Sequence, residues 1–253
     1  MLQKHIYLFY FCLLKFGYVF SQPNCIERIS TLDFTISIFT TSGDVYTYGQ
    51  NDYGQVGNGN NINQTSPFLR TDSKSFKSIS HSSTHTVALV HDNQVYAWGA
   101  NFLGQLGNNS TTSSNIPVLV SNDTDWAKVD LGALHTVALK ENGTIWGWGN
   151  NDNFSLSSSN NPPYYFTVPI QLSPTNDWTD ISAGASRTFA IKNDGTLWAR
   201  GNNINYGLGL PSPVFFNEFT QVGTATNWKK VKSPVLNNFS IGLKTDNTLW
   251  GWG

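Results

Sequence analysis

Apolar and polar residues alternate along much of this chain in short runs, the period-two pattern typical of β-strands. Residues 85–99, HTVALVHDNQVYAWG, contain two such runs, separated by Asp92-Asn93. Dipeptides of this kind tolerate positive φ, so we predict two alternating strands joined by a two-residue hairpin turn. Later segments carry the equivalent pairs Asn142-Gly143, Asp194-Gly195 and Asp246-Asn247.

The same string returns at nearly constant spacing. A dipeptide that ends in glycine closes each segment. These glycines are separated by 50, 50, 52 and 52 residues; they are Gly49, Gly99, Gly149, Gly201 and Gly253. An aromatic anchor keeps nearly the same interval, at Phe76, Trp126, Trp178 and Trp228. The strand that starts HTVAL at His85 and His135 returns in altered form at Arg187 and Phe239. Three markers in one order indicate an internal repeat of about 50 residues.

Each repeat supplies about four short strands. A strand such as FKSIS or WAKVD precedes the hairpin, and a loop rich in amides and glycine follows it. A proline-containing extended piece, such as IPVLV or VPIQL, completes the unit. This is the content of one propeller blade. We therefore predict an all-β fold, a β-propeller with about five blades or part-blades, in which the fifth lacks its last strand.

The recurring residues have structural explanations. Trp98 and Trp148 alternate with small apolar residues, so both faces of each sheet are expected to pack against neighbouring blades. The glycines permit close backbone approach. Asn51 and Asn101, two residues past the aromatic-glycine step, are expected to bond backbone within a turn, as are Asn151 and Asn203.

The histidines are also assigned structural roles. His85 and His135 are expected to form hydrogen bonds within their blades, because Arg187 and Phe239 replace them in later repeats and leave no ring of metal ligands. His81 and His91 are placed in loops or turns.

The stretch from Gly132 to Leu139, GALHTVAL, and the stretch from Asn101 to Gly107, NFLGQLG, resemble the regulator of chromosome condensation repeat family. The resemblance extends over residues 26–253 and implies a seven-bladed propeller. Later copies depart from it, since Phe154-Ser155-Leu156-Ser157 replaces Gly-Gln-Leu-Gly and Arg200 stands in a tryptophan position. The last copy, TLWGWG, lacks the polar outer face of a terminal repeat, so we expect the sequence to be C-terminally truncated. A smaller closed ring and completion by a second chain are the alternatives.

The amino terminus has a different pattern. Lys4 and His5 precede the apolar run from Ile6 to Leu14, and residues 19–21 resemble a cleavage site. We predict a signal peptide over residues 1–21 and a secreted, cell-surface or periplasmic protein formed by residues 22–253. The apolar run is too short to span a bilayer, and no membrane span is expected in the mature chain.

Charge and motifs narrow the function. The net charge is −1 and charged residues make up 12% of the chain, which does not favour nucleic-acid binding. No nucleophile elbow, phosphate-binding loop or paired-cysteine site is present in the sequence, so no catalytic residue, cofactor or metal is predicted.

The sequence favours an exported, non-enzymatic propeller that binds a protein or a glycan through variable loops. The family resemblance implies an alternative, guanine-nucleotide exchange on a small GTPase, although repeats of 50–52 residues leave no room for the protruding hairpin of that activity. An enzyme with its site on further blades is a third hypothesis. The candidate binding residues are Asp52, Tyr53, Phe102, Leu103, Asn153, Phe154, Asn205 and Tyr206, with Tyr164, Tyr165 and Phe166 in the enlarged third loop.

Overall fold

Almost all regular structure in the described residues is β-strand. The computed structural model describes residues 25–32, 34–72, 74–158, 164–211, 214–235 and 238–253. Within these ranges it has nineteen strands and one 3-10 turn, η1 (Ile204–Tyr206). The predicted signal peptide lies outside the described residues. No helix with the length and apolar content needed to cross a bilayer is found in the described part of the chain.

The strands form five antiparallel sheets in chain order, four with four strands and the last with three. The first sheet holds β1 (Ile26–Leu32), β2 (Thr35–Thr40), β3 (Val45–Gly49) and β4 (Gln64–Leu69). The second holds β5 (Phe76–His81), β6 (His85–Val90), β7 (Val95–Gly99) and β8 (Ser114–Leu119). The third holds β9 (Trp126–Leu131), β10 (His135–Lys140), β11 (Ile145–Asn150) and β12 (Tyr165–Gln171). The fourth holds β13 (Trp178–Ala183), β14 (Arg187–Lys192), β15 (Leu197–Asn202) and β16 (Phe215–Gln221), and the fifth β17 (Trp228–Lys232), β18 (Ser240–Lys244) and β19 (Leu249–Trp252).

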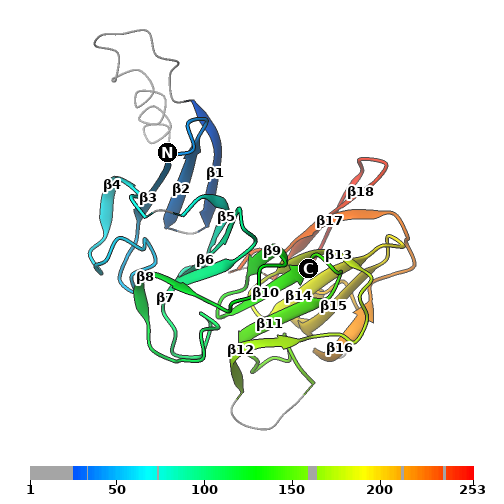
Figure 1. Cartoon of the computed structure of the whole chain (residues 1–253). Helices are drawn as coiled ribbons and strands as arrows, with labels where there is room; N and C mark the ends of the chain where they lie inside the picture. The colour runs from blue at the N-terminus through cyan, green and yellow to red at the C-terminus, as the bar shows by residue number, and fades with distance from the viewer. Residues whose placement is uncertain (1–24, 33, 73, 159–163, 212–213, 236–237) are drawn as a thin grey trace.

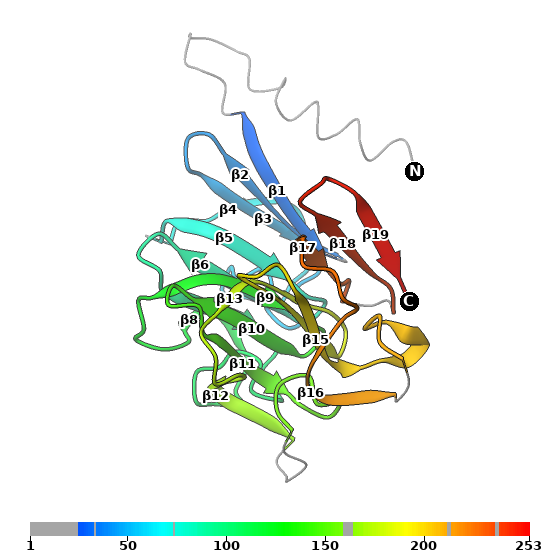
Figure 2. The ribbon, with the colours of Figure 1, turned by 90° about the vertical axis from the view of Figure 1, so that its right-hand side faces the viewer.

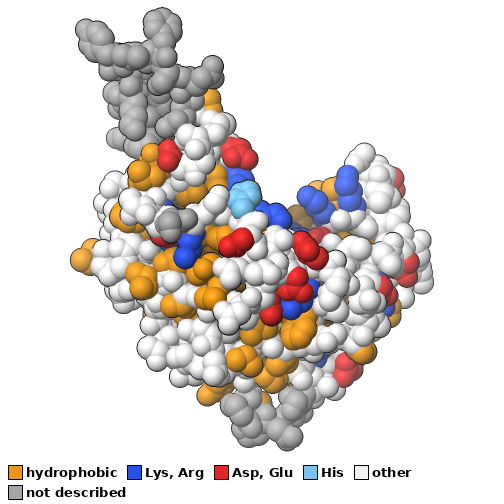
Figure 3. All heavy atoms as spheres, viewed as in Figure 1, with side chains coloured by type: hydrophobic (Ala, Val, Ile, Leu, Met, Phe, Trp, Pro, Cys, Tyr) orange, Lys and Arg blue, Asp and Glu red, His pale blue; other side chains and the backbone are white. Residues whose placement is uncertain are grey.

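The sheets are blades around a shared axis. The first strands of successive sheets, β1, β5, β9, β13 and β17, contact one another in that order and form the inner layer. The fourth strands lie at the periphery, and the five sheets follow an arc (Figures 1 and 2). The surface is hollowed between the first and last blades (Figure 3). The predicted β-propeller and its five blades, the last without a fourth strand, are confirmed, whereas a total of seven blades stays a prediction.

The hairpins between second and third strands differ from the two-residue turns expected. Val90 N–H donates to Gln94 C=O and Asn93 N–H donates to Val90 C=O, both at 3.0 Å. This leaves a three-residue loop whose last residue, Asn93, has φ +61°. The prediction of positive φ at Asn93 was correct, but the loop has three residues rather than two, because a type I turn followed by one left-handed residue also matches the twist of the strands.

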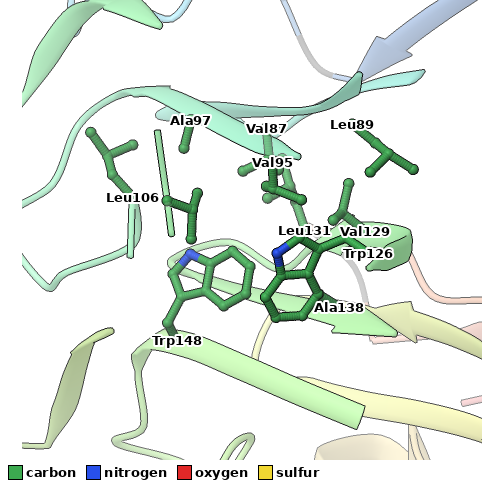
Figure 4. Close-up of a cluster of buried hydrophobic side chains, with 11 residues drawn as sticks. Val87, Leu89, Val95, Ala97, Leu106, Trp126, Val129, Leu131, Ala138 and Trp148 are labelled. Carbon is green, nitrogen blue, oxygen red and sulfur yellow. The ribbon is translucent and has the colours of Figure 1, made fainter. Parts of the chain in front are cut away.

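Neighbouring blades pack through dry apolar faces. Between the second and third blades, Val87, Val95 and Ala97 face Trp126 and Trp148 of the next sheet, as Figure 4 shows, and all five are fully buried. The two indole rings meet edge to face with centroids 6.1 Å apart. Each ring buries on the order of 150–250 Å², so every blade contact contributes several kcal/mol before entropy is subtracted.

An ion pair connects the inner strands of three blades. The carboxylate of Asp130 on β9 accepts hydrogen bonds from Lys232 Nζ on β17 at 2.7 and 2.8 Å. It also accepts from Ser182 Oγ and from the backbone N–H of Ala183, both at 3.0 Å, on the intervening strand β13. A buried carboxylate with this many donors is well compensated. Asp130 therefore helps to set the curvature of the arc from the third to the fifth blade.

Candidate functional site

Most of the candidate residues lie at one end of the propeller, which we call the loop face. Tyr165 and Phe166, expected in the third loop, instead belong to the outer strand β12, because they pair with Asn150 and Gly149 of β11. The loop face consists of the connections between first and second strands and between third and fourth strands of each blade. The two kinds of connection touch, since Ala100 N–H donates to Thr84 C=O and Asn150 N–H to Leu134 C=O, both at 2.9 Å. The hairpins between second and third strands form the opposite end, the turn face. Function assigned to the loops therefore maps to a single surface.

A buried asparagine organises each long loop. Asn101 is fully buried, and its amide nitrogen donates to the carbonyls of Ser110 and Thr112 at 2.9 and 3.1 Å. Its oxygen accepts the Leu106 N–H at 2.9 Å. Asn51, Asn151 and Asn203 make the corresponding bond to the residue five positions later. One amide therefore holds an irregular loop of about a dozen residues in shape, which allows the exposed residues of that loop to vary.

The Gly-Gln-Val-Gly stretch of the first loop and the Gly-Gln-Leu-Gly stretch of the second each join two blades. Gln55 of the first blade offers its backbone carbonyl to Trp98 Nε1 and to Thr86 Oγ1 of the second blade, both at 2.8 Å. Gln105 offers the same carbonyl to Trp148 and Thr136 of the third blade at 3.0 and 3.1 Å. The tryptophan and the glutamine loop are thus parts of one inter-blade contact.

The glycine after the tryptophan belongs to the same contact. Gly149 has φ +96°, and a Cβ there would lie 2.6 Å from the Leu134 carbonyl oxygen of its own blade and 3.2 Å from Gln105 Cα of the preceding blade. No other residue fits that close approach.

Comparison with known families identifies these repeats. Models of the regulator of chromosome condensation (RCC1) repeat match residues 42–89, 92–139 and 142–191, which together exceed half of the chain. A second model of the RCC1 repeat matches residues 76–105, 126–154 and 178–207. The chain belongs to the RCC1 repeat family. No curated protein matches it in sequence.

Solved structures share the fold at low sequence identity. Human WBSCR16 is similar with a TM-score of 0.78 and 18% identity over 92% of this chain and 62% of that chain. Yeast RCC1 (Prp20), solved with Kap60, gives a TM-score of 0.71 and 21% identity over 85% of this chain and 53% of that chain. A second structure of Prp20p from Saccharomyces cerevisiae, a protein that binds Gsp1p and histones, gives 0.71 and 20%, covering 85% and 55%. This RCC1-repeat chain thus spans between about half and five-eighths of the length of these neighbours.

The fourth blade departs from the RCC1 repeat but keeps the inter-blade bond. Arg200, in the tryptophan position, is buried and donates from Nε to the Phe154 carbonyl at 2.9 Å. Its guanidinium lies 5.4 Å from the ring centre of Phe219 on the outer strand, and that ring packs on Trp178 at 5.1 Å. The aromatic volume lost from β15 is thus supplied from β16. Burial lowers the pKa of Arg200 to about 10, with Glu218 opposing the shift.

The repeat histidines reach across blade boundaries. His85 bonds Ser82 Oγ within its blade at 2.7 Å and lies 3.3 Å from Thr136 Oγ1 of the next blade. His135 lies 3.5 Å from Thr188 Oγ1 of the fourth blade. The expectation of bonds within each blade therefore covers only part of their role. Within the described ranges, no group of three or more His, Cys, Asp or Glu side chains is placed to hold a metal ion.

His81 is not in a loop, contrary to expectation. It ends β5 and is buried between Ser37 Oγ at 2.8 Å and Thr86 Oγ1 at 3.0 Å. Ser37 belongs to the first blade, so His81 also connects two blades. Burial lowers the pKa of His81 and of His85 to about 3 and that of His135 to about 4. All three imidazoles are therefore neutral at pH 7.

Several candidate residues form an exposed aromatic rim on the loop face. Phe102 is 62% exposed and Tyr206 is 65% exposed. Tyr53 of the first blade meets Phe102 of the second edge to face at 6.0 Å, and Phe154 of the third meets Phe215 of the fourth at 6.2 Å. Asp52, Asn205 and Tyr164 are exposed, whereas Leu103, Asn153, Tyr165 and Phe166 are half-buried. Sequence reasoning missed the exposed aliphatic residues Ile62, Ile116 and Ile204.

Two rim aromatics adopt an unfavourable backbone conformation. Gly54 and Gly104 have φ +82° and +71° in the first two loops. Phe154 and Tyr206 occupy the same repeat position and keep the left-handed conformation, with φ +59° and +58°. The left-handed conformation destabilises the folded state by about 1–2 kcal/mol when the residue is bulky. Such strained residues occur most often at functional sites. The repeat spacing could have revealed this, because both residues stand in a glycine column.

The long loops are almost uncharged and mix polar amides and hydroxyls with apolar residues. Residues 50–63, 100–113, 151–163 and 203–214 contain no Lys or Arg, and their charged residues are Asp52 and Asp152. Asparagine is the commonest residue in them, and serine, threonine and glycine recur. Such a surface can form hydrogen bonds and bury rings but has little long-range electrostatic attraction.

A small opening on the loop face leads to a stability prediction. Ser155 stands where the first two loops have Gln55 and Gln105, and Gln55 Nε2 donates to the Ser83 carbonyl of the next blade at 3.1 Å. Beside Ser155 lies a cavity of about 30 Å³, lined also by His135 and Ser186. Ser155→Gln should restore the bridging amide and raise the free energy of unfolding by about 1 kcal/mol. The midpoint of urea unfolding measures this change in stability. Ser155→Ala, which lacks the amide, should give no gain. A lower midpoint for Ser155→Gln than for the wild type would refute the prediction.

Proposed function

We propose that this protein is an exported, non-enzymatic RCC1-type propeller whose loop face binds another protein. The observation that carries the proposal is Tyr206, a ring 65% exposed on a backbone with φ +58°, where the first two repeats have glycine. Exposed aromatic anchors surrounded by polar groups are typical of protein interfaces. The candidate signal peptide over residues 1–21 supports export.

The rim also fits the size and chemistry of a protein contact better than those of a small molecule. The exposed rings extend over four consecutive blades, from Tyr53 to Tyr206, and the cavity on this face holds about 30 Å³. Ligand pockets for small molecules are usually about 300–1,000 Å³. A glycan that lies across the rim is the competing ligand class, and a glycan array distinguishes it from a protein.

The experiment compares variants in capture from the secreted or surface proteome of the host. Tyr206→Gly removes the ring and the backbone cost together, so it should raise the free energy of unfolding by about 1 kcal/mol and yet lose the partner. Phe102→Ala should also lose it, whereas Lys77→Ala on the turn face should keep it. Recovery of the same proteins by Tyr206→Gly and wild type would refute the loop-face proposal.

Guanine-nucleotide exchange is the second candidate, supported by the likeness to yeast Prp20p, which binds Gsp1p. The test is release of labelled GDP from a small GTPase of the host by the intact protein. If the wild-type protein accelerates GDP release and Tyr206→Gly abolishes this acceleration, nucleotide exchange would replace the export proposal, because secretion separates the protein from cytosolic GTPases. Fusion of residues 1–21 to a reporter, followed by assay of the medium, tests export itself.

A further inference from the structure

The outer strands of the first three blades carry a proline at one common position. In each of these three blades, the second residue of the third strand pairs with a residue of the fourth strand, as Tyr46 pairs with Leu69 in the first blade. The proline lies two positions before that paired residue of the fourth strand. These prolines are Pro67, Pro117 and Pro169. In the fourth blade Trp198 pairs with Gln221, so the same position is Phe219. Among the four outer strands of the described structure, β16 alone has a backbone N–H there.

The regular part of β16 next to Phe219 has N–H groups directed alternately to the blade and to the open edge. Val222 N–H donates to Leu197 C=O of β15 at 2.7 Å, and the residues paired next to it are Gln221 and Thr220. Along an antiparallel strand, alternate residues direct their N–H groups toward the partner strand. The N–H of Gln221 is therefore directed to the open edge, and Phe219 stands directly before the last regular pair, Thr220 with Ala199, where the pairing of β15 and β16 becomes irregular. Proline at this place blocks edge pairing in the other blades, a common protection of exposed edges.

A pocket adjoins the unprotected edge. It has a volume of about 180 Å³ and is walled by Trp178, Trp198 and Phe219, with Leu172 and Pro174. This volume suits a single side chain better than a drug-sized ligand. An added strand along β16 would place alternate side chains on the side of the pocket, because successive side chains of a strand point to opposite faces.

The charges at the pocket favour a basic neighbour. Lys192 lies 4.9 Å from the ring centres of both Trp178 and Trp198 and is paired with Asp177 at 3.0 Å. Glu218 also lines the pocket, is exposed, and takes part in no salt bridge of the described structure. Its carboxylate is thus available to a cation from outside.

We propose that β16 accepts an extended segment of a partner protein as a fifth strand of the fourth blade. The segment places one apolar side chain in the pocket and a Lys or Arg beside Glu218, while its backbone bonds Phe219 and Gln221. This is recognition by β-strand addition, in which main-chain bonds supply affinity and side-chain pockets supply specificity. The site is distinct from the loop face and does not depend on its function.

The test uses the whole chain and a synthetic, N-acetylated heptapeptide of alternating valine and threonine with one lysine. Binding is followed by NMR of backbone amides and by their exchange with deuterium. We expect the Phe219 and Gln221 amides to shift and to exchange at least about tenfold more slowly at saturating peptide, as for a new hydrogen bond. Shifts confined to Phe102 and Tyr206 on the loop face would overturn the proposal.

Two matched changes test the backbone bond. Phe219→Pro should weaken peptide binding about tenfold or more, whereas Phe219→Ala, which also loses the ring but keeps the N–H, should weaken it less. A peptide N-methylated at its central residue should bind about tenfold more weakly to the wild-type chain, and this comparison holds even if Phe219→Pro does not fold. Equal binding of the methylated and unmethylated peptides would overturn the proposal.

The same chain and peptides test the role of the Glu218 charge and the pairing of two copies of the chain through β16. Glu218→Gln should weaken binding of the lysine peptide about two- to threefold and leave a norleucine version unchanged. If the chain dimerises with rising concentration and Phe219→Pro abolishes the dimer, the edge of β16 binds a second copy of the chain. That result would overturn the assignment of this edge to a partner segment.

Discussion

Acidification from pH 7 to pH 5 should lower the free energy of unfolding by about 6 kcal/mol, about 2 kcal/mol for each of three buried histidines. His81 and His85 have pKa values lowered to about 3, and His135 to about 4. Burial is the main cause in all three. The positive charge of Arg70 also lowers the pKa of His81, while Asp130 partly opposes the shift at His135.

The direction follows from proton uptake. Between pH 6.5 and about 4 the unfolded chain binds protons at these imidazoles and the folded chain does not, so acid favours unfolding. The stabilisation is complete above pH 6.5, the ordinary histidine pKa, and is lost as the pH falls toward the lowered values. Most of this window lies above the ordinary pKa of aspartate, about 3.9, so the carboxylates contribute little to it.

Urea unfolding at pH 7, 6 and 5 measures the effect. His85→Gln removes one of the three titrating groups, so the loss of stability between pH 7 and pH 5 should shrink by about a third, whatever the variant does to stability at pH 7. An unchanged loss in this variant would show that His85 does not titrate as described, and equal stability of the wild type at both pH values would contradict the whole explanation.

Replacing Trp148 by alanine should cost about 3–5 kcal/mol, a large share of the stability of a typical domain. The ring is fully buried between the second and third blades, packs on Trp126 at 6.1 Å, and donates from Nε1 to the Gln105 carbonyl at 3.0 Å. The loop glycine Gly107 also lies against it, since a Cβ there would approach Trp148 to 2.7 Å. The variant thus leaves a cavity and removes one of the bonds that join the blades.

Trp250 is the matched control for this substitution. It is the same residue type in a third strand but is 51% exposed, with its Nε1 bonded to Thr248 Oγ1 at 3.0 Å within its own hairpin. Trp250→Ala should cost about 1 kcal/mol or less. Denaturant midpoints at constant slope measure both losses, and similar losses in the two variants would show that the blade contact does not depend on Trp148 as described.

Much of the candidate site was accessible to sequence reasoning because the repeat aligns its residues. The buried asparagines were expected at the right positions and in the right role, since an amide two residues past a turn glycine can reach only local backbone. The long loop of each blade was recognised as exposed because the repeat aligns its amide- and glycine-rich residues. Arg200 could not be understood from the sequence, because its compensation by Phe219 depends on two strands that pair only in the folded blade.

The sequence by itself determined the blade: strand order, hairpin positions and the five repeats all follow from local alternation and spacing, which act over a few residues. The tertiary structure alone decided which groups meet between blades. The bonds of His81 to Ser37 and of Trp98 to Gln55 join residues 44 and 43 positions apart. The outward N–H of Gln221 depends on the register of β15 and β16. Contacts of this kind depend on how sheets and strands pack, and no pattern within one strand encodes that packing.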